Sequence, residues 1–156
     1  MKTVRKRRKQ SKTDYLKRIK LLKSGKPRVV FRKTNRYIIA QYVVSKEAKD
    51  SIKIGVNSKI LLKYGWPKEK IGSLKSLSAS YLTGYIMGKK ILKNKLEEPI
   101  LDFGMIRTTH KTKVFAFLKG LIDSGIKIPC KEEAFPEESR IMKEGINVNE
   151  IKSKIE

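Results

Sequence analysis

The chain has 156 residues, of which 39% are hydrophobic and 34% are charged, and its formal net charge is +23 at pH 7. This length and apolar content are sufficient for one domain with its own core. So large a positive charge needs a polyanion to neutralise it, usually nucleic acid, whereas a membrane-surface protein would set its bases along an amphipathic helix with bulky apolar partners.

The positive charge is concentrated near the N-terminus. Residues 1–36 hold sixteen Lys and Arg residues and a single acid, Asp14, whereas residues 131–156 carry a net charge of −2. The contiguous bases of residues 5–9 do not match a mitochondrial transit peptide, which spreads Arg along an amphipathic helix. We therefore expect a basic N-terminal arm and helix (residues 1–27), a globular domain (residues 28–130) and a short acidic tail (residues 131–156).

The N-terminal arm is expected to be followed by one short helix. Residues 1–12 have no hydrophobic period, which predicts an arm that is disordered without its partner. The helix is predicted to begin near residues 11–13, with Ser11 three positions before Asp14 in a loose capping box. Gly25 ends it, and Pro27 prevents its return. The apolar stripe predicted to dock on the body holds Tyr15, Ile19 and Leu22.

Five runs predict strands. Residues 28–32 and 37–44 are rich in β-branched and aromatic side chains and indicate a hairpin with a short basic tip. The second run is apolar on both faces, which favours a strand covered on both sides in a layered α/β domain. Residues 51–57 alternate as a half-exposed strand does, and residues 100–103 and 126–128 predict two short strands.

The remaining segments predict helices. Residues 59–64 form a short one, residues 76–94 a long one and residues 112–124 another. In the long helix the small residues Gly84 and Gly88, with Ala79, would let the backbone approach a neighbour closely. Its predicted apolar stripe holds Tyr81, Tyr85 and Leu92. The order β-β-β-α-β-α-β predicts an α/β fold with a mixed β-sheet layered between helices.

Several short motifs follow one another in the order of one known family. They are Thr13-Asp14-Tyr15, Leu21 to Val30, Arg32-Lys33-Thr34-Asn35, Ala40-Gln41, Tyr64-Gly65-Trp66, Ser78 to Gly84, Leu101 to Gly104 and Val114-Phe115-Ala116. On these residues the chain resembles, over residues 5–130, the universal large-subunit ribosomal protein that binds 5S ribosomal RNA, family eighteen, in its archaeal and eukaryotic form.

The resemblance implies a mixed-sheet α/β domain of the type shared with a small-subunit ribosomal protein. It also implies a cytoplasmic role in the central protuberance of the large ribosomal subunit. The implied partners are 5S rRNA, 23S-type rRNA, the neighbouring 5S-binding ribosomal protein and other central-protuberance proteins. Many relatives of this form continue well past residue 131, so the contacts of their longer tail are not carried over to the short acidic residues 131–156.

The candidate RNA-binding residues lie on the arm, the first helix and the hairpin. Bases of the arm are expected to follow a phosphate backbone, and arginines on the hairpin to bind phosphate with a planar fork. Thr34 and Asn35 would bond sugar edges or close the turn, and Tyr15 and Tyr37 would stack on bases or pack in the core. The full set is Arg5, Lys6, Arg7, Arg8, Lys9, Lys12, Tyr15, Arg18, Arg28, Arg32, Lys33, Thr34, Asn35, Arg36 and Tyr37.

Signals of enzymes and cofactors are weak. Asp102-Phe103-Gly104 spells the metal-binding tripeptide of protein kinases, but no glycine-rich loop accompanies it. His110 is the sole histidine, and the single cysteine, Cys130, permits no disulfide or cysteine-rich zinc site. We therefore expect no catalytic residue, metal or cofactor. The alternative that stays open is a nucleic-acid-binding protein outside the ribosome, such as an RNA chaperone or a compaction protein, with similar affinity for many polyanions.

Overall fold

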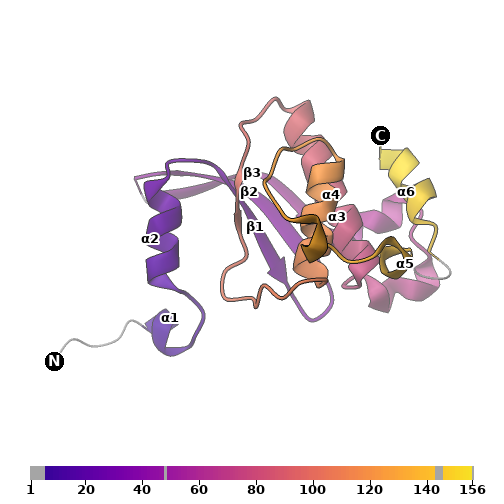
Figure 1. The fold of residues 1–156 in the computed structure, drawn as a ribbon, viewed down its shortest axis with the longest axis horizontal. Helices are drawn as coiled ribbons and strands as arrows, with labels where there is room; N and C mark the ends of the chain where they lie inside the picture. The colour runs from indigo at the N-terminus through magenta and orange to yellow at the C-terminus, as the bar shows by residue number, and fades with distance from the viewer. Residues whose placement is uncertain (1–5, 48, 143–145, 156) are drawn as a thin grey trace.

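A computed structural model describes residues 6–47, 49–142 and 146–155. Its centre is one four-stranded mixed sheet with the strand order β3-β2-β1-β4 (Figure 1). The strands are β1 (Arg28–Lys33), β2 (Ile38–Lys46), β3 (Lys49–Asn57) and β4 (Ile100–Asp102). Helices pack around this sheet, which confirms the expected α/β fold class.

The predicted hairpin is present. Strand β1 pairs antiparallel with β2, and Phe31 lies opposite Ala40. Strand β2 pairs antiparallel with β3, with a register shift between Tyr42 and Val43, and β4 runs parallel to β1. The hairpin signal was therefore sufficient to pair the first two strands, whereas the parallel partner of β1 comes from a segment about 70 residues further along the chain.

The last predicted strand, residues 126–128, does not form. Gly125 takes φ +109°, and the Ile126 N–H donates to the Leu121 carbonyl (3.3 Å), so the chain folds back over the end of the preceding helix. Ile126 is buried there. The prediction was wrong because its apolar side chain covers a helix end, as in the hydrophobic contact of a helix C-cap.

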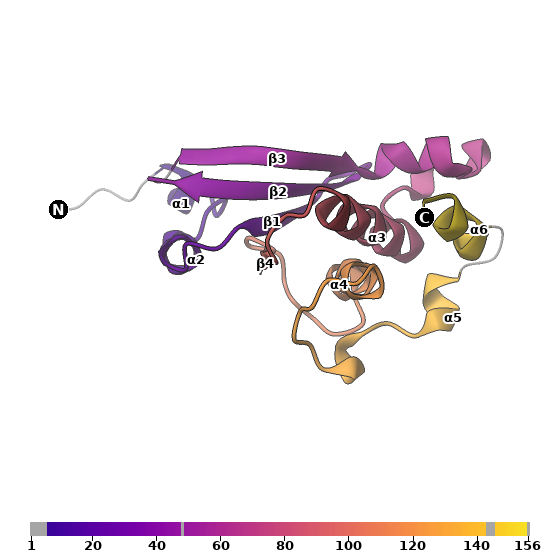
Figure 2. The ribbon, with the colours of Figure 1, turned by 90° about the horizontal axis from the view of Figure 1, so that it is seen from above.

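Two helices cover one face of the sheet, α3 (Leu77–Lys93) and α4 (Lys113–Asp123) (Figure 2). Ser76 caps α3 by accepting a hydrogen bond from the Ala79 N–H (3.2 Å). The helices touch through their backbones, because a Cβ on Gly84 would collide with the Phe117 carbonyl oxygen and one on Gly120 with that of Tyr81. The close approach predicted for the small residues of α3 is confirmed. Leu92, placed on the apolar stripe, is 46% exposed instead.

The N-terminal segment differs from its prediction in two respects. Residues Lys6–Lys9 form a short helix, α1, where the sequence predicts no structure, and the second helix, α2 (Tyr15–Lys23), begins after Asp14. The carboxylate of Asp14, not the hydroxyl of Ser11, accepts a hydrogen bond from the Lys17 N–H (3.1 Å). An ionised carboxylate is a strong cap acceptor and also favours the positive end of the helix dipole.

Residues after 130, predicted as an acidic tail, contribute to the same core. They include the short 3₁₀ helix η3 (Glu132–Ala134) and the helices α5 (Glu138–Ile141) and α6 (Val148–Ile155). Ser78 of α3 donates a hydrogen bond to the Ile141 carbonyl. The apolar side chains that these residues add to the core are Ile141, Ile146, Val148 and Ile151. Two further 3₁₀ helices, η1 (Ser58–Tyr64) and η2 (Lys68–Ser73), join β3 to α3.

Candidate nucleic-acid interface

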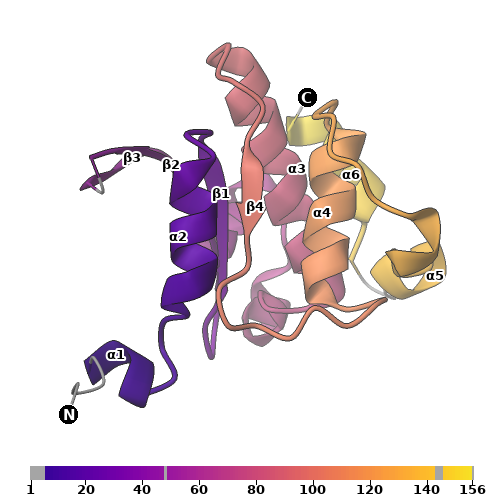
Figure 3. The same ribbon diagram turned by 60° about the vertical axis from the view of Figure 1, so that its left-hand side comes forward.

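Alternating side chains of β1 face two different layers. Phe31 points to the core and its ring lies 4.9 Å from that of Phe117 on α4. Arg28 and Arg32 point to the opposite face, over which α2 lies (Figure 3). This period-two alternation is what a strand imposes. It places the arginines of the hairpin under the N-terminal helix and the apolar residues against α3 and α4.

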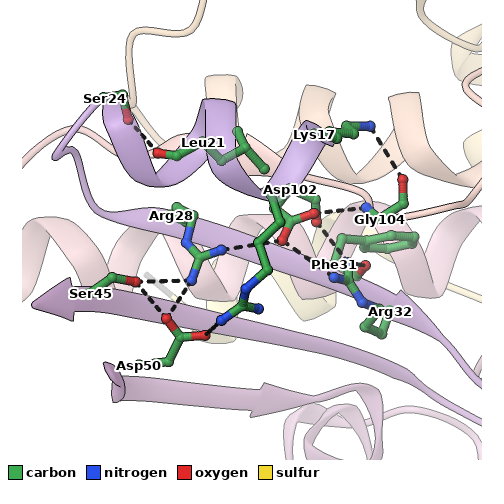
Figure 4. Close-up of polar contacts among 11 residues, drawn as sticks. Lys17, Leu21, Ser24, Arg28, Phe31, Arg32, Ser45, Asp50, Asp102 and Gly104 are labelled. Atoms are coloured by element: carbon green, nitrogen blue, oxygen red, sulfur yellow. Dashed lines mark hydrogen bonds and ion pairs between the residues drawn. The ribbon is translucent and has the colours of Figure 1, made fainter. Parts of the chain in front are cut away.

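Arg28 is at the centre of a buried ion cluster (Figure 4). Its guanidinium donates to Asp50 Oδ1 at 2.8 Å and to Ser45 Oγ at 3.0 Å, and Asp102 Oδ2 lies 3.7 Å away. The Arg28 side chain is only 3% exposed. The prediction that Arg28 contacts RNA phosphate does not fit this placement, because two carboxylates already hold its charge inside the protein.

Arg32 lies beside this cluster with 43% of its side chain exposed. It donates to the Phe31 and Asp102 carbonyl oxygens at 2.7 and 2.9 Å, and one nitrogen lies 3.3 Å from Asp102 Oδ2. The Asp102 carboxylate also accepts from the Gly104 N–H (2.8 Å). Arg32 is therefore held in one orientation and still presents part of its guanidinium to solvent, as a preorganised phosphate contact requires.

Polar contacts fasten α2 to this face. Lys17 Nζ donates to the Gly104 carbonyl oxygen (3.2 Å), and Arg18 donates to Asp50 Oδ2 (3.0 Å). The predicted apolar docking stripe is wrong in one position, because Ile19 is 49% exposed, and no side chain of α2 is fully buried. The surface beneath the helix is built of arginines and carboxylates, so charged side chains of α2 make the fixed contacts.

The charges around Asp50 act on its ionisation. Burial by itself raises the pKa of the Asp50 carboxyl, but the hydrogen bond from Ser45 and the charges of Arg28 and Arg18 outweigh burial and lower the pKa below its ordinary value of 3.8. The folded chain thus binds this proton less readily than the unfolded chain. Asp50 stabilises the fold above the ordinary carboxyl pKa, and that stabilisation is lost as the pH falls through the lowered pKa.

We expect Asp50→Asn to lower the free energy of unfolding by about 2 kcal/mol at pH 7. Removing one partner of a buried pair costs about 3–5 kcal/mol, and we reduce this because the Asp50 side chain is 32% exposed. The difference from the native chain should begin to shrink below about pH 4, where the unfolded chain takes up the Asp50 proton, and should vanish only below the lowered pKa of the folded chain. Urea unfolding between pH 3 and pH 7 measures it, with the exposed Glu98→Gln as control. A difference that does not change with pH would contradict the ion-pair account.

The exposed members of the predicted RNA-binding set lie on or just after the short helix α1 and at the hairpin tip. Lys6, Arg7, Arg8 and Lys9 of α1 are all exposed, as are Lys12 and, at the tip, Lys33, Asn35 and Arg36. Thr34 closes the turn, because its hydroxyl accepts from the Tyr37 N–H (2.9 Å) and donates to the Tyr37 carbonyl (2.8 Å).

A small cavity of about 130 Å³ lies between α2 and the sheet. Among its lining residues are four of the predicted bases, Arg7, Lys12, Arg18 and Arg32. Arg7 Nε donates to Thr13 Oγ1 (2.9 Å), which holds the end of α1 beside α2. Between residues 6 and 36 the only acid is Asp14. The N-terminal segment and the face of β1 beneath it therefore form one surface rich in positive charge.

The other predicted residues are placed as follows. Tyr15 and Tyr37 are half-buried, and Tyr37 packs against the core. Arg5 lies outside the described residues. Sequence reasoning missed Lys17, Asp50 and Asp102, which position α2 and the arginines of β1. For Asp50 and Asp102 the sequence does offer one signal, which is that acidic residues are scarce in this chain. A carboxylate in so basic a chain is a candidate for an ion pair.

Within residues 6–47, 49–142 and 146–155, no group of three His, Cys, Asp or Glu side chains is placed to hold a metal ion. In the same part of the chain no helix is both long and apolar enough to span a bilayer.

The comparisons with known proteins decide the family. The sequence model of the family described as ribosomal large subunit proteins 60S L5, and 50S L18 matches residues 1–99 and 94–131. The chain belongs to this family. Its large-subunit ribosomal role is therefore structural, and a member of this family is not an enzyme, as the sequence predicts.

Three archaeal relatives show how far the similarity extends. Each is called large ribosomal subunit protein uL18. The relative from Korarchaeum cryptofilum is 47% identical over 140 residues, covering 90% of this chain and 70% of its own length. The relative from Methanothermobacter thermautotrophicus is 41% identical over 140 residues, and the one from Methanosphaera stadtmanae 43% over 141, each covering 90% of this chain and 71% of the relative.

Proposed function

We propose that this ribosomal protein binds 5S rRNA and helps attach it to the 23S-type rRNA in the central protuberance of the large subunit. The observation that carries the proposal is the group of bases Arg7, Lys12, Arg18 and Arg32 around one cavity between α2 and the sheet. Further exposed bases lie on α1 and at the hairpin tip, and Asp14 is the single acid between residues 6 and 36. Ribosomal RNA is the polyanion that a large-subunit protein meets. Further proposed partners are the neighbouring 5S-binding ribosomal protein and other proteins of the central protuberance, in the cytoplasm.

The surface combines fixed and adjustable contacts. Arg32 is held by the Asp102 carboxylate and two carbonyl oxygens, so its free edge meets a phosphate with little loss of conformational entropy. The bases of α1 stand on a four-residue helix outside the core and can adjust to the course of an RNA backbone. A folded RNA fits this division of contacts, because its phosphates, 2′-hydroxyls and loop bases are read by shape.

Binding to several polyanions tests the proposal. We expect at least about a hundredfold preference for 5S rRNA over transfer RNA and duplex DNA at physiological salt. Six to ten phosphate contacts give a log–log salt slope of about −4 to −9. Filter binding or fluorescence anisotropy at several salt concentrations measures both quantities. Equal affinity for the three nucleic acids would overturn the assignment to 5S rRNA and favour a general nucleic-acid-binding protein.

A further inference from the structure

A second cavity opens on the other face of the sheet, at the start of α4. Its volume is about 460 Å³, within the range of about 300–1,000 Å³ that is typical of ligand pockets. Five separate segments form it: the end of β1, the start of α3, the loop after β4, the start of α4, and α5. The lining residues are Phe31, Lys33, Leu77, Ile106, Arg107, Lys111, Thr112, Lys113, Val114 and Arg140.

The cavity is strongly cationic. Five of its lining side chains are bases, and none of the described residues that line it is an acid. Outside the lining, Glu137 pairs with Lys111 at 3.3 Å and is itself exposed. Burial lowers the pKa of Lys113, and repulsion from Lys33 and Lys75 lowers it further. These five bases are not scattered over the surface but line one cavity. An anion bound in that cavity would relieve the repulsion between them.

The floor of the cavity is apolar. Leu77 and Ile106 are half-buried, and Phe31 and Val114, which also line the cavity, are buried. The start of α4 adds to the attraction for an anion, because the helix has no acid in its first turn and no side-chain cap. The Thr112 hydroxyl donates to the Thr109 carbonyl instead (2.7 Å). A ligand with a flat apolar part and an attached negative group matches both the floor and the rim.

We propose that this cavity binds one unstacked nucleotide of a single-stranded rRNA segment. The base lies against Leu77 and Ile106, and the phosphate is held at the rim by Arg107 and Lys113. The inference rests on the proposed RNA-binding function and adds a second contact to it, on the face of the sheet opposite α2. RNA fits better than an acidic peptide for two reasons. The apolar side chains of the lining, Phe31 among them, offer a surface on which a base can lie, and Lys33 of the lining is the residue next to the hairpin tip.

Nuclear magnetic resonance titration with hexauridylate tests the pocket. We expect the backbone amides of residues 113–115 to shift on addition of this RNA. The double variant Arg107→Gln, Lys113→Gln should weaken hexauridylate binding about tenfold, with a log–log salt slope shallower by about 1.4, because about 0.7 is lost per single-strand phosphate contact. The control variant Lys93→Gln, Lys95→Gln removes the same charge from exposed positions at the end of α3 and should leave both quantities nearly unchanged.

Two results would overturn the proposal that this cavity binds a nucleotide. One is hexauridylate binding that leaves residues 113–115 unshifted. The other is an aspartate peptide of equal charge that binds the cavity as tightly as hexauridylate, which would assign it to an acidic protein segment. Both are distinguishable from failure of the proposed function. A native chain that still prefers 5S rRNA over transfer RNA keeps that function, whatever occupies the cavity.

Discussion

Replacing Arg7, Arg8, Lys9 and Lys12 together by Gln is expected to weaken 5S rRNA binding at least about a hundredfold, a loss of about 2.7 kcal/mol. These side chains are exposed and contribute to no core packing, so the fold should be unchanged. The log–log salt slope should become shallower by about 3–4, because each lost phosphate contact removes about 0.7–0.9. Anisotropy titrations with labelled 5S rRNA from low to physiological salt measure both effects.

A control with the same change in net charge separates a local contact from general attraction. Lys93, Lys95, Lys127 and Lys154 are exposed and lie outside the N-terminal segment and the hairpin. Their replacement by Gln should reduce affinity only a few-fold, through the long-range field of the protein. Equal losses in the two quadruple variants would show that total charge, not the surface formed with α1, determines binding.

The second large effect is expected in the helix pair. Gly120→Ala should lower the free energy of unfolding by about 3 kcal/mol, the upper end of the usual cost of an overpacked core. A Cβ at this position would collide with the Tyr81 carbonyl oxygen and lie 2.9 Å from the Tyr85 nitrogen. Both are backbone atoms of α3, so relief requires the two helices to move apart. The intrinsic preference of a helix for Ala over Gly, about 1 kcal/mol, acts in the opposite direction.

Urea unfolding followed by circular dichroism measures this change. Gly72→Ala is the matched control, since a Cβ there meets nothing within 4 Å and the residue is exposed. That variant should stay within about 0.5 kcal/mol of the native chain. If Gly120→Ala proved as stable as the native chain, the backbone contact between α3 and α4 would not be the tight one described above.

Local signals in the sequence were sufficient for much of the fold. The predicted helix of residues 76–94 differs from α3 by one residue at each end, because Ser76 caps its start and Asn94 ends it. The hairpin followed from two β-rich runs joined by a short polar connection. Such features depend on residues a few positions apart, whose propensities and caps act in any surroundings. The basic N-terminal surface could equally be predicted from the sequence, because charges that are contiguous in the chain stay close together however the chain folds.

Contacts between distant segments decided the rest. In the sequence, Arg28 and Arg32 look alike, since both are arginines of the same β-rich run. Only the folded chain places Asp50 and Asp102, from two other strands, beside Arg28 and makes it a buried ion-pair residue.

By itself, then, the sequence determined the class of fold, the helices with strong caps, the basic N-terminal surface and the family. The tertiary structure alone decided which bases face solvent, how α2 docks through charges, how residues after 130 join the core, and where a cationic cavity opens. The physical reason is that burial and convergence of charge depend on side chains brought together across many residues, and no local pattern along the chain records that proximity.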